Sequence, residues 1–537
     1  MSKIKHAMLI PLYLLGVAAA TPQAQAQIPH LQRQGTATQL VVDGQPFLIL
    51  GGELHNSSSS SLAYMEPLWK SMMDLHLNTV LAGVSWELLE PEEGRFDFRL
   101  VDGLIDGARR HNIRLVFLWF GSWKNGMSSY IPLWVKKDYQ RFARVRLQDG
   151  RTVEVLSTLC AANWEADAKA YAALMRHIRE VDGTDHTVIM MQVENEVGVL
   201  RDSRDRSEAA NEAFSQPVPP ELMDALTRDK DKLQPDLRQK WESAGSRTAG
   251  TWEQVFGAGP GGDEAFMAWS YGSYVEKVAK AGKAEYAIPM YANTWLSNPQ
   301  GTPGNWPSGC PEPHVMDIWR AAAPHLDILS PDIYAPNFAE WCRRYVHAGN
   351  PLFIPEMRRE ADGARNVFYA IGQHDAIGVS PFAFDSMANP GSSPLAASYG
   401  ILAQVAPLIL QHQGKGELTG FLLDKEHPSA KAEMAGYELE ISLDSIFGDN
   451  AEIGYGLIIA TGPDEFVGAG SGFRVAFSAK TPGARITGVG QVDEGTFLDG
   501  KWIPGRRLNG DENDQGQYWR VANGQLSISR CTVYRYQ

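Results

Sequence analysis

The sequence predicts an α/β protein with two parts: a (β/α)8 TIM barrel, followed by a smaller antiparallel β-sandwich-like domain. Three observations predict this fold class. Apolar, β-rich segments alternate with amphipathic helical segments up to residue 390. After residue 411 the pattern changes to short strand-like runs separated by glycine-rich turns. The chain has 537 residues, which is enough for one large barrel and a smaller domain.

The first segment of the chain, residues 1–26, has the pattern of an export signal. Lys3 and Lys5 form a short positive region, residues 7–20 are apolar, and Ala24-Gln25-Ala26 places small residues where a signal peptidase cuts. The apolar stretch is too short for an ordinary membrane-spanning helix. We therefore expect an exported protein, periplasmic or extracellular, and the alternative is an uncleaved N-terminal anchor.

Eight segments are predicted to form the strands of the barrel. Several are continuous apolar runs, as expected of strands that are buried on both faces. The segments are residues 47–54, 78–86, 114–123, 187–196, 289–295, 326–334, 352–357 and 378–385. Amphipathic helical segments lie between them; Leu100, Leu104, Ile105 and Ala108, for example, form one apolar stripe. Strands that alternate with helices imply a parallel sheet, and eight such units fit a (β/α)8 barrel.

The segment between the fourth and fifth predicted strands, residues 197–288, is far longer than one helix requires. Long insertions in such barrels usually fall in the loops that follow strands, on the catalytic face. We expect this one to shape the substrate site, and a solvated surface decoration is the alternative. The barrel domain is thus predicted over residues 27–411 and the β-rich domain over residues 412–537.

Charge and motif content restrict the possible partners. The formal net charge is −14, which is unfavourable for binding nucleic acid or an anionic membrane and is compatible with a neutral carbohydrate substrate. No His-Glu-x-x-His motif, Cys-x-x-Cys pair or phosphate-binding glycine loop is present, so we expect no cofactor and no metal. The four cysteines, which could be free or paired, are Cys160, Cys310, Cys342 and Cys531. The oligomeric state stays open.

Two of the predicted strands end in a glutamate, at the edge where these barrels carry their chemistry. The fourth strand ends in Glu194-Asn195-Glu196, and the seventh reaches Glu356. Two carboxyl groups that face each other across a barrel mouth can have their pKa values pushed apart, so that one is an acid and the other a nucleophile. Retaining glycoside hydrolysis requires such a pair, about 5–5.5 Å apart.

The alternatives to this interpretation are that both glutamates are structural carboxylates of the barrel rim, or that Glu194 is the acid instead of Glu196. In an ideal strand, alternation places Glu194 and Glu196 on one side and Asn195 on the other. We therefore expect a local bulge near the strand end, which would let Asn195 and Glu196 both face the substrate.

These residues support a family resemblance. Asn195-Glu196 together with Glu356 resembles the retaining glycoside hydrolase clan that has catalytic glutamates on strands four and seven. Within that clan, Gly51-Gly52-Glu53-Leu54-His55 and Trp86-Glu87-x-x-Glu90-Pro91-x-x-Gly94-x-Phe96-Asp97-Phe98 look like family 35, which consists mainly of β-galactosidases. The resemblance covers residues 40–390, and the tail looks like the small C-terminal domain of a bacterial subgroup.

The resemblance implies roles for four residues. Glu196 would be the acid/base and Glu356 the nucleophile. Asn195 would bind the substrate 2-hydroxyl, and Tyr334, which ends the sixth strand, would steady the nucleophile.

The sequence also departs from the pattern of the family. The usual tyrosine of the second strand is replaced by Gly83, and the usual Asn-Ala-Glu run of the third strand is replaced by residues 121–127. Galactose specificity is therefore less secure than the mechanism. The further residues expected to bind sugar are Trp123 by stacking, and Lys124, Asn125, Glu53, His55 and Glu87 by hydrogen bonds.

The function predicted from the sequence is an exported, retaining exo-β-galactosidase that trims terminal galactose from oligosaccharides or plant polysaccharides such as hemicellulose. One alternative keeps the chemistry and changes the sugar or the mode of attack: a β-glucosidase, β-mannosidase or endo-glycanase of the same clan. The other is a catalytically inactive carbohydrate-binding protein on the same scaffold.

Overall fold

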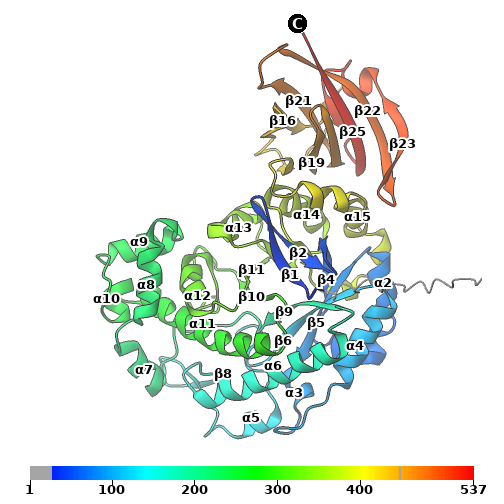
Figure 1. Ribbon diagram of the computed structural model, residues 1–537. Helices are drawn as coiled ribbons and strands as arrows, with labels where there is room; N and C mark the ends of the chain where they lie inside the picture. Colours follow the sequence, from blue (N-terminus) through cyan, green and yellow to red (C-terminus); the bar gives the residue numbers. More distant parts are fainter. Residues whose placement is uncertain (1–26, 447–448) are drawn as a thin grey trace, which may run out of the picture.

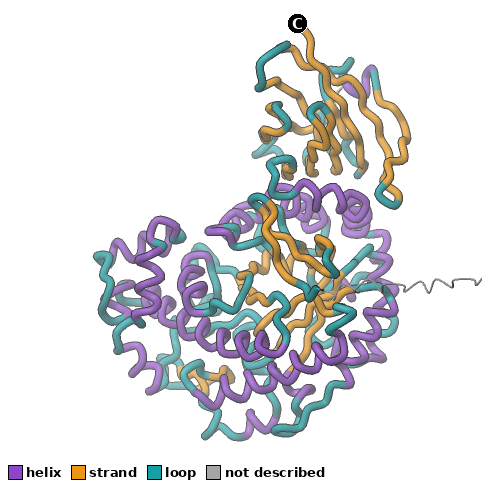
Figure 2. Tube along the Cα trace, viewed as in Figure 1, coloured by secondary structure: helices purple, strands orange, loops and turns teal. Residues whose placement is uncertain are grey.

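The computed structural model describes residues 27–446 and 449–537 (Figures 1 and 2). The predicted export signal falls on residues 1–26, which lie outside the described residues.

Eight parallel strands close into a barrel, which confirms the predicted fold class. In sheet order, with β9 pairing back to β10, they are β10 (Met290–Trp295), β11 (Ile328–Ile333), β12 (Phe353–Met357), β13 (Gly378–Pro381), β4 (Ile49–Glu53), β5 (Thr79–Ser85), β6 (Arg114–Phe120) and β9 (Val188–Val193). Each strand lies inside one of the eight predicted segments. The prediction succeeded because strands buried between helices and barrel interior leave continuous apolar runs in the sequence.

Helices surround the strands of the barrel (Figure 2), and at least one helix follows each strand in the chain. They are α2 (Leu68–Asp74), α4 (Arg99–Arg110), α6 (Ala161–Asp182), α11 (Pro260–Glu285), α12 (Met316–Ala322), α13 (Phe338–Tyr345), α14 (Ala361–His374) and α15 (Pro394–His412). The predicted stripe lies on α4, where Leu104, Ile105 and Ala108 are fully buried and Leu100 is half-buried. Burial of such a stripe against the sheet is what stabilises each helix.

A small antiparallel sheet that the sequence did not predict closes one end of the barrel. It consists of β1 (His30–Gln34), β2 (Ala37–Val42) and β3 (Gln45–Phe47). Leu40 and Val42 of β2 join the interior cluster formed by Ile49, Val116 and Phe353, which lie near the amino ends of their strands. This end is therefore filled with apolar side chains, and only the carboxyl end of the barrel is left for a polar site.

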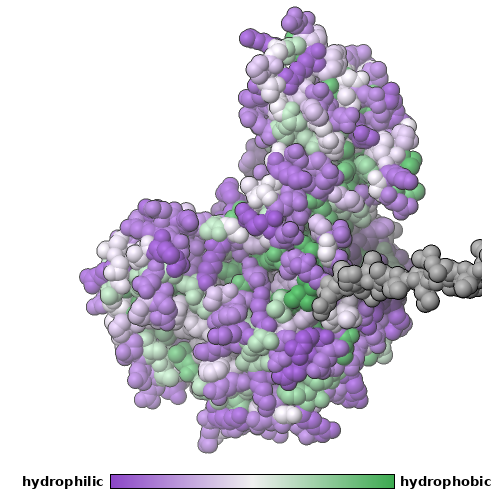
Figure 3. Space-filling model, viewed as in Figure 1, coloured by the Kyte–Doolittle hydropathy of each residue, from purple (hydrophilic) through white to green (hydrophobic). Residues whose placement is uncertain are grey.

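The C-terminal domain is a sandwich of two antiparallel sheets around an apolar core. One sheet contains, in order, β14 (Leu418–Leu423), β19 (Gly454–Gly462), β20 (Glu465–Ser471), β25 (Ser527–Tyr536), β22 (Ile486–Leu498) and β23 (Lys501–Leu508). The other contains β15 (Ser429–Met434), β16 (Tyr437–Leu443), β21 (Phe473–Ala479) and β24 (Trp519–Val521). The sandwich lies against α14 and α15 (Figure 1), and the visible surface of both domains is mainly hydrophilic (Figure 3).

Helix α15 joins the two domains. By length and composition it is apolar enough to cross a membrane, and it is the one helix of the described residues that passes this test. It packs against α14 and against β19, β20 and β22 of the sandwich, and Leu395, Tyr399, Leu402, Val405 and Ile409 are buried. Its apolar character is therefore explained by its position in the interface between the domains.

The insertion after β9 forms a group of short helices beside α11 and α12 (Figure 1). They are α7 (Glu208–Ser215), α8 (Pro220–Arg228), α9 (Pro235–Ser243) and α10 (Trp252–Phe256). The last part of the predicted insertion, from Pro260 onward, is α11 itself, a regular barrel helix that packs on α6.

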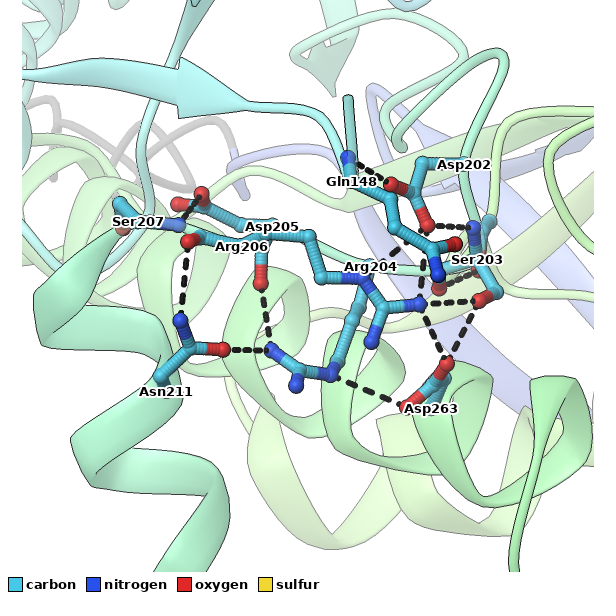
Figure 4. Close-up of polar contacts among 10 residues, drawn as sticks. Gln148, Asp202, Ser203, Arg204, Asp205, Arg206, Ser207, Asn211 and Asp263 are labelled. Carbon is cyan, nitrogen blue, oxygen red and sulfur yellow. Dashed lines mark hydrogen bonds and ion pairs between the residues drawn. The ribbon is translucent and has the colours of Figure 1, made fainter. Parts of the chain in front are cut away.

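The charged run at the start of the insertion forms a buried ionic network (Figure 4). Arg204 Nε lies 3.0 Å from Asp263 Oδ1, and Arg206 Nη2 lies 2.8 Å from Asp263 Oδ2 and 2.9 Å from Asp202 Oδ1. Asp202 also accepts a 2.7 Å hydrogen bond from the backbone N–H of Gln148. The network thus ties the loop after β9 to α11 and to the turn of the hairpin β7 (Arg144–Arg146) and β8 (Thr152–Leu156).

Candidate active site

Four carboxyl groups meet at the carboxyl end of the barrel. Glu53 ends β4, Asp332 lies in β11, Glu356 lies in β12, and Glu196 follows the end of β9. Oxygen atoms of Glu196, Asp332 and Glu356 lie within 4.8 Å of one another. All four residues are at most 5% exposed. The structure therefore brings the two predicted catalytic glutamates together, and it adds Asp332, which the sequence did not predict.

The backbone just after β9 decides which side chains enter the site. The strand pairs with β6 up to Trp119 and Val193, and the next residues leave the ladder with φ of +61° at Glu194 and +42° at Glu196. This left-handed backbone, and not the expected β-bulge, breaks the alternation, so that Asn195 and Glu196 both face the other carboxyl groups. Such conformations are unfavourable for non-glycine residues and often occur at functional sites.

Glu194 points away from this group. Its Oε2 accepts a 2.8 Å hydrogen bond from the backbone N–H of Trp123, and its other oxygen lies beside Asp167 in the space left by Gly121. Asp167 comes from α6 and accepts a hydrogen bond of 2.5 Å from Ser122 Oγ. Burial and the charge of Asp167 raise the pKa of Glu194 well above its usual range. Its geometry therefore argues against Glu194 as the acid.

Three side chains from different elements contact Glu356. Tyr334 donates a 3.0 Å hydrogen bond to Oε2, Asn195 Nδ2 lies 3.4 Å from Oε1, and Lys124 Nζ lies 3.6 Å from Oε1. A shift of register between β12 and β13, between Ile354 and Met357, accompanies the position of Glu356 at the barrel mouth. A carboxylate held by a phenol, an amide and an ammonium is fixed in orientation, as a nucleophile must be.

Glu196 has partners of a different kind. Asn125 Nδ2 donates a 2.5 Å hydrogen bond to Oε2, and the backbone N–H of Glu196 donates to Asn293 Oδ1 at 2.9 Å. Asn293 in turn donates to Asp332 Oδ2 at 2.6 Å. Burial, with the nearby charge of Glu356, raises the pKa of Glu196 to about 7. At neutral pH a large fraction of this carboxyl group is therefore protonated and able to act as an acid.

Burial also disfavours the ionised form of the other two carboxyl groups, Glu53 and Asp332. Burial raises the pKa of Glu53 and of Asp332 well above the usual range, and the charge of Glu356 adds to the effect in both. Among the described residues no amide, hydroxyl or amine group donates a hydrogen bond to either oxygen of Glu53. Buried oxygens without a partner are costly, and a hydroxyl group of a sugar would satisfy them.

Trp123 does not lie in this site. Its ring has no exposed surface and packs edge-on against Tyr271 at 5.0 Å and Tyr274 at 4.5 Å between ring centroids. The expectation that Trp123 stacks on a sugar is therefore wrong for this structure. The Trp123 ring is packed in the core and has no free face on which a sugar could lie.

The last two predicted sugar-binding residues lie outside the group of four. His55 is exposed at the rim, where its Nδ1 lies 2.8 Å from Asp385 Oδ1. Glu87 lies 3.6 Å from Lys136 Nζ at the surface. It lines a pocket of about 260 Å³ beside the ends of β5 and β6, together with Asn56, Ser57, Ser85, Asp97, Phe120 and Tyr130.

Sequence reasoning missed Asp332 and Asn293. Both interrupt predicted apolar strands, and Asp332 is two positions before Tyr334, which places the two side chains on the same face of a strand. A search for polar residues at alternate positions near strand ends could have found them. The four cysteines form no disulfide in the described part of the chain.

Comparisons with known proteins indicate which families this chain resembles. Residues 61–267 match the model of glycoside hydrolase family 42, described as beta-galactosidase. Residues 395–520 match a domain of unknown function, DUF5597. The matches support a relationship to β-galactosidases of the clan with paired glutamates, while the expected membership of family 35 is not confirmed and family 42 fits instead.

Two curated relatives are both β-galactosidases. A beta-galactosidase of Xanthomonas manihotis is 31% identical over 195 residues, which cover 35% of this chain and 29% of the relative. Beta-galactosidase GalA of Bacillus licheniformis is 28% identical over 136 residues, which cover 24% of this chain and 18% of the relative. The matched segments thus span less than a third of the length of these relatives.

The solved structures that match about two thirds of this chain include two β-galactosidases. The enzyme from Marinomonas ef1 gives a TM-score of 0.45 at 12% identity, covering 67% of this chain and 60% of that one. The enzyme from Bacillus circulans sp. alkalophilus gives a TM-score of 0.46 at 16% identity, covering 68% of this chain and 57% of that one.

Proposed function

We propose that this protein is a retaining exo-β-galactosidase with Glu196 and Glu356 as its catalytic pair. The observation that carries the proposal is the approach of their carboxylate oxygens to within 4.8 Å. Retaining glycosidases have carboxyl groups about 5–5.5 Å apart, whereas inverting enzymes leave about 6.5–9.5 Å for a water molecule. The short separation favours direct attack by one carboxylate on the sugar.

In the proposed reaction Glu356 attacks the anomeric carbon while Glu196 gives its proton to the leaving oxygen. The bond between carbon and leaving oxygen breaks as the ester bond to Glu356 forms. Glu196 then removes a proton from water, whose oxygen attacks the same carbon and releases Glu356 as a carboxylate. The high pKa of Glu196 and the three contacts of Glu356 support this division of roles.

Galactose as the substrate sugar is favoured by the matched family model and by both curated relatives. Another glycosidase of the same clan is the second candidate, because Gly83 and residues 121–127 replace the side chains that usually grip galactose. We further propose that the protein is exported and acts on terminal residues of oligosaccharides or plant polysaccharides, the export resting on the pattern of residues 1–26.

A panel of nitrophenyl glycosides tests the proposal. We expect the β-galactoside to be hydrolysed fastest, and a faster β-glucoside or β-mannoside would select the second candidate. Glu356→Gln should lower kcat by about 10⁴-fold or more, while Glu360→Gln, at an exposed carboxylate of the same segment, should leave kcat unchanged. Full activity in Glu356→Gln would contradict the proposed pair. The N-terminal sequence of the protein recovered from its native cells tests the export.

A further inference from the structure

A tight turn in the loop after β6 reaches the two catalytic carboxylates. The backbone N–H groups of Lys124 and Met127 donate to each other's carbonyl oxygens at 2.8 and 3.0 Å. The two residues between them, Asn125 and Gly126, have φ of +52° and +66°. Positive φ at both central residues is the pattern of a type I′ turn, for which Asn-Gly is the most favoured sequence. The local sequence therefore favours this turn.

The turn gives each catalytic carboxylate one partner. Asn125 places its amide 2.5 Å from Glu196, and Lys124 places its ammonium 3.6 Å from Glu356. The Lys124 side chain is 4% exposed, and its Nζ also lies 5.2 Å from the centre of the Phe120 ring. The two partners differ in the property that matters for acid–base chemistry, because one is neutral and the other is a cation.

Lys124 is a buried cation beside the four carboxyl groups. The carboxyl groups of Glu356 on β12, Glu53 on β4, Glu196 after β9 and Asp332 on β11 all act on it. The phenols of Tyr334, Tyr291 and Tyr345 and the thiol of Cys310 are further titratable groups near these carboxyls. Burial by itself would lower the pKa of Lys124, but these carboxylates outweigh it and raise that pKa above its ordinary value. Lys124 therefore stays charged.

Four buried carboxyl groups around one ammonium cannot all be ionised, because each further negative charge is repelled by the others and is poorly solvated. The first carboxylate to be stabilised is the one closest to the cation. Within the described residues, Glu356 is the carboxylate that lies within 4.0 Å of Lys124 Nζ.

We propose that Lys124 is a positioning residue that assigns the two roles: its ammonium keeps Glu356 ionised as the nucleophile and so leaves the proton of the pair on Glu196. The proposal rests on the proposed function and extends it by naming the group that separates the two glutamates. The pair carries one negative charge before glycosylation, on Glu356, and one afterwards, on Glu196. Lys124 can therefore act as counter-ion in both states.

The test compares Lys124→Met, Lys124→Arg and the unchanged protein. An activated 2-deoxy-2-fluoro-β-galactosyl fluoride needs little acid assistance, so its rate of covalent attachment to Glu356 reports the ionisation of the nucleophile. Mass spectrometry measures this rate across pH. We expect Lys124→Met to require a pH about 1–3 units higher for half-maximal labelling, with rates that converge with the unchanged protein at alkaline pH. Lys124→Arg should retain the original midpoint, because the charge is kept.

The pH profile of kcat/KM gives a second readout. Lys124 also lowers the pKa of Glu196, so its removal should move the acidic and the basic limb of the bell to higher pH together. Lys136→Met is the matched control, because Lys136 lies at the rim against Ser129 O and Glu87. Its profile should not move.

Three outcomes would overturn the proposal. In Lys124→Met, labelling that falls by the same factor at every pH would indicate a merely structural role. In Lys124→Arg, a shifted midpoint would show that charge is not the decisive property, and this arm decides the matter if the methionine variant does not fold. A profile that moves equally in Lys136→Met would exclude a specific effect. If the unchanged protein neither labels nor hydrolyses any β-glycoside, it is the proposed function that fails instead.

Discussion

Glu196 and Glu356 are chemically the same side chain, and their surroundings make them different. Glu196 is buried and accepts a hydrogen bond from the neutral amide of Asn125, and burial raises its pKa to about 7. Glu356 lies beside the Lys124 ammonium and the Tyr334 hydroxyl. Pairs of titratable groups whose environments separate them in this way are the usual basis for assigning an acid and a nucleophile.

Chemical rescue by azide tests the two roles at the scale of single residues. In Glu196→Ala an activated aryl glycoside can still form the glycosyl-enzyme, and azide, which needs no base, should replace water and give the β-azide. In Glu356→Ala azide should attack the substrate directly and give the α-azide. NMR of the products identifies the anomer. The reverse pattern of anomers would show that Glu356 is the acid/base and Glu196 the nucleophile. Rescue in Glu194→Ala, and not in Glu196→Ala, would show that Glu194 is the acid.

The pH dependence of activity follows from the raised pKa of Glu196. The acid must be protonated in the free enzyme, so kcat/KM should fall as pH rises through about 7. A carboxyl group with a raised pKa in the folded state favours folding while it is protonated and opposes it when ionised. In Glu196→Gln the alkaline loss of stability should therefore be smaller than in the unchanged protein. Thermal unfolding at pH 5 and pH 8 measures it, and equal losses in both proteins would contradict the shift.

At the scale of elements, the site depends on how strands and turns end. The left-handed residues after β9 place Asn195 and Glu196 together, and the turn at residues 124–127 supplies their neighbours. Gly126 is the residue of that turn for which positive φ is least costly. Its φ is +66°, and a Cβ would lie 3.3 Å from the carbonyl oxygen of Gly198.

Gly126→Ala should therefore weaken the site through the backbone. A side chain at positive φ costs about 1 kcal/mol, and any shift of the turn moves Lys124 and Asn125 together. We expect kcat/KM to fall about tenfold, which corresponds to about 1.4 kcal/mol. Gly150→Ala is the matched control: its φ is +84°, it lies in open space in the β7–β8 hairpin, and it should cost similar stability with no loss of activity. Equal kinetic effects in the two variants would contradict a role for the turn.

At the scale of the whole molecule, the barrel and the β-sandwich share a close apolar interface. Phe368 of α14 packs on Tyr455 of β19 with ring centroids 5.6 Å apart. At Gly372 of the same helix, an added Cβ would lie 2.8 Å from the Cα of Gly420 in β14. The two backbones can approach this closely because both residues lack a side chain.

Gly372→Ala tests whether the two domains unfold as one unit. Within a helix this change normally adds about 1 kcal/mol of stability, but here the clash is with backbone and cannot be relieved by a rotamer. We expect the Tm to fall in a calorimetric scan, with the activity of the folded protein preserved because the site lies at the barrel mouth. A higher Tm would show that the interface accommodates the added methyl group at little cost. It would contradict a close coupling between the two domains.

Much of the fold was predictable from the chain. All eight barrel strands lie in predicted segments, because burial on both faces leaves a mark in composition that needs no tertiary information. The sheet β1–β3 was not predicted, because its short strands carry no long apolar run, and their burial depends on the open end of the barrel. The sequence likewise showed that the insertion after the fourth strand is long. It did not predict the helices of the insertion or the buried ionic network of Figure 4, because both depend on contacts with the rest of the barrel.

Some features of the candidate site could likewise be predicted from the sequence, and others could not. The sequence by itself placed Glu196 and Glu356 close to the ends of two parallel strands, and parallel strands bring their carboxyl ends to one edge. Only the tertiary structure decided that Glu194 faces away and that Trp123 is core. It also brought Asp332 and Asn293 into the site, and placed Lys124 beside Glu356. The physical reason is that strand position is set by local pattern, whereas the direction of a side chain and its charge depend on backbone angles, burial and neighbours from distant parts of the chain.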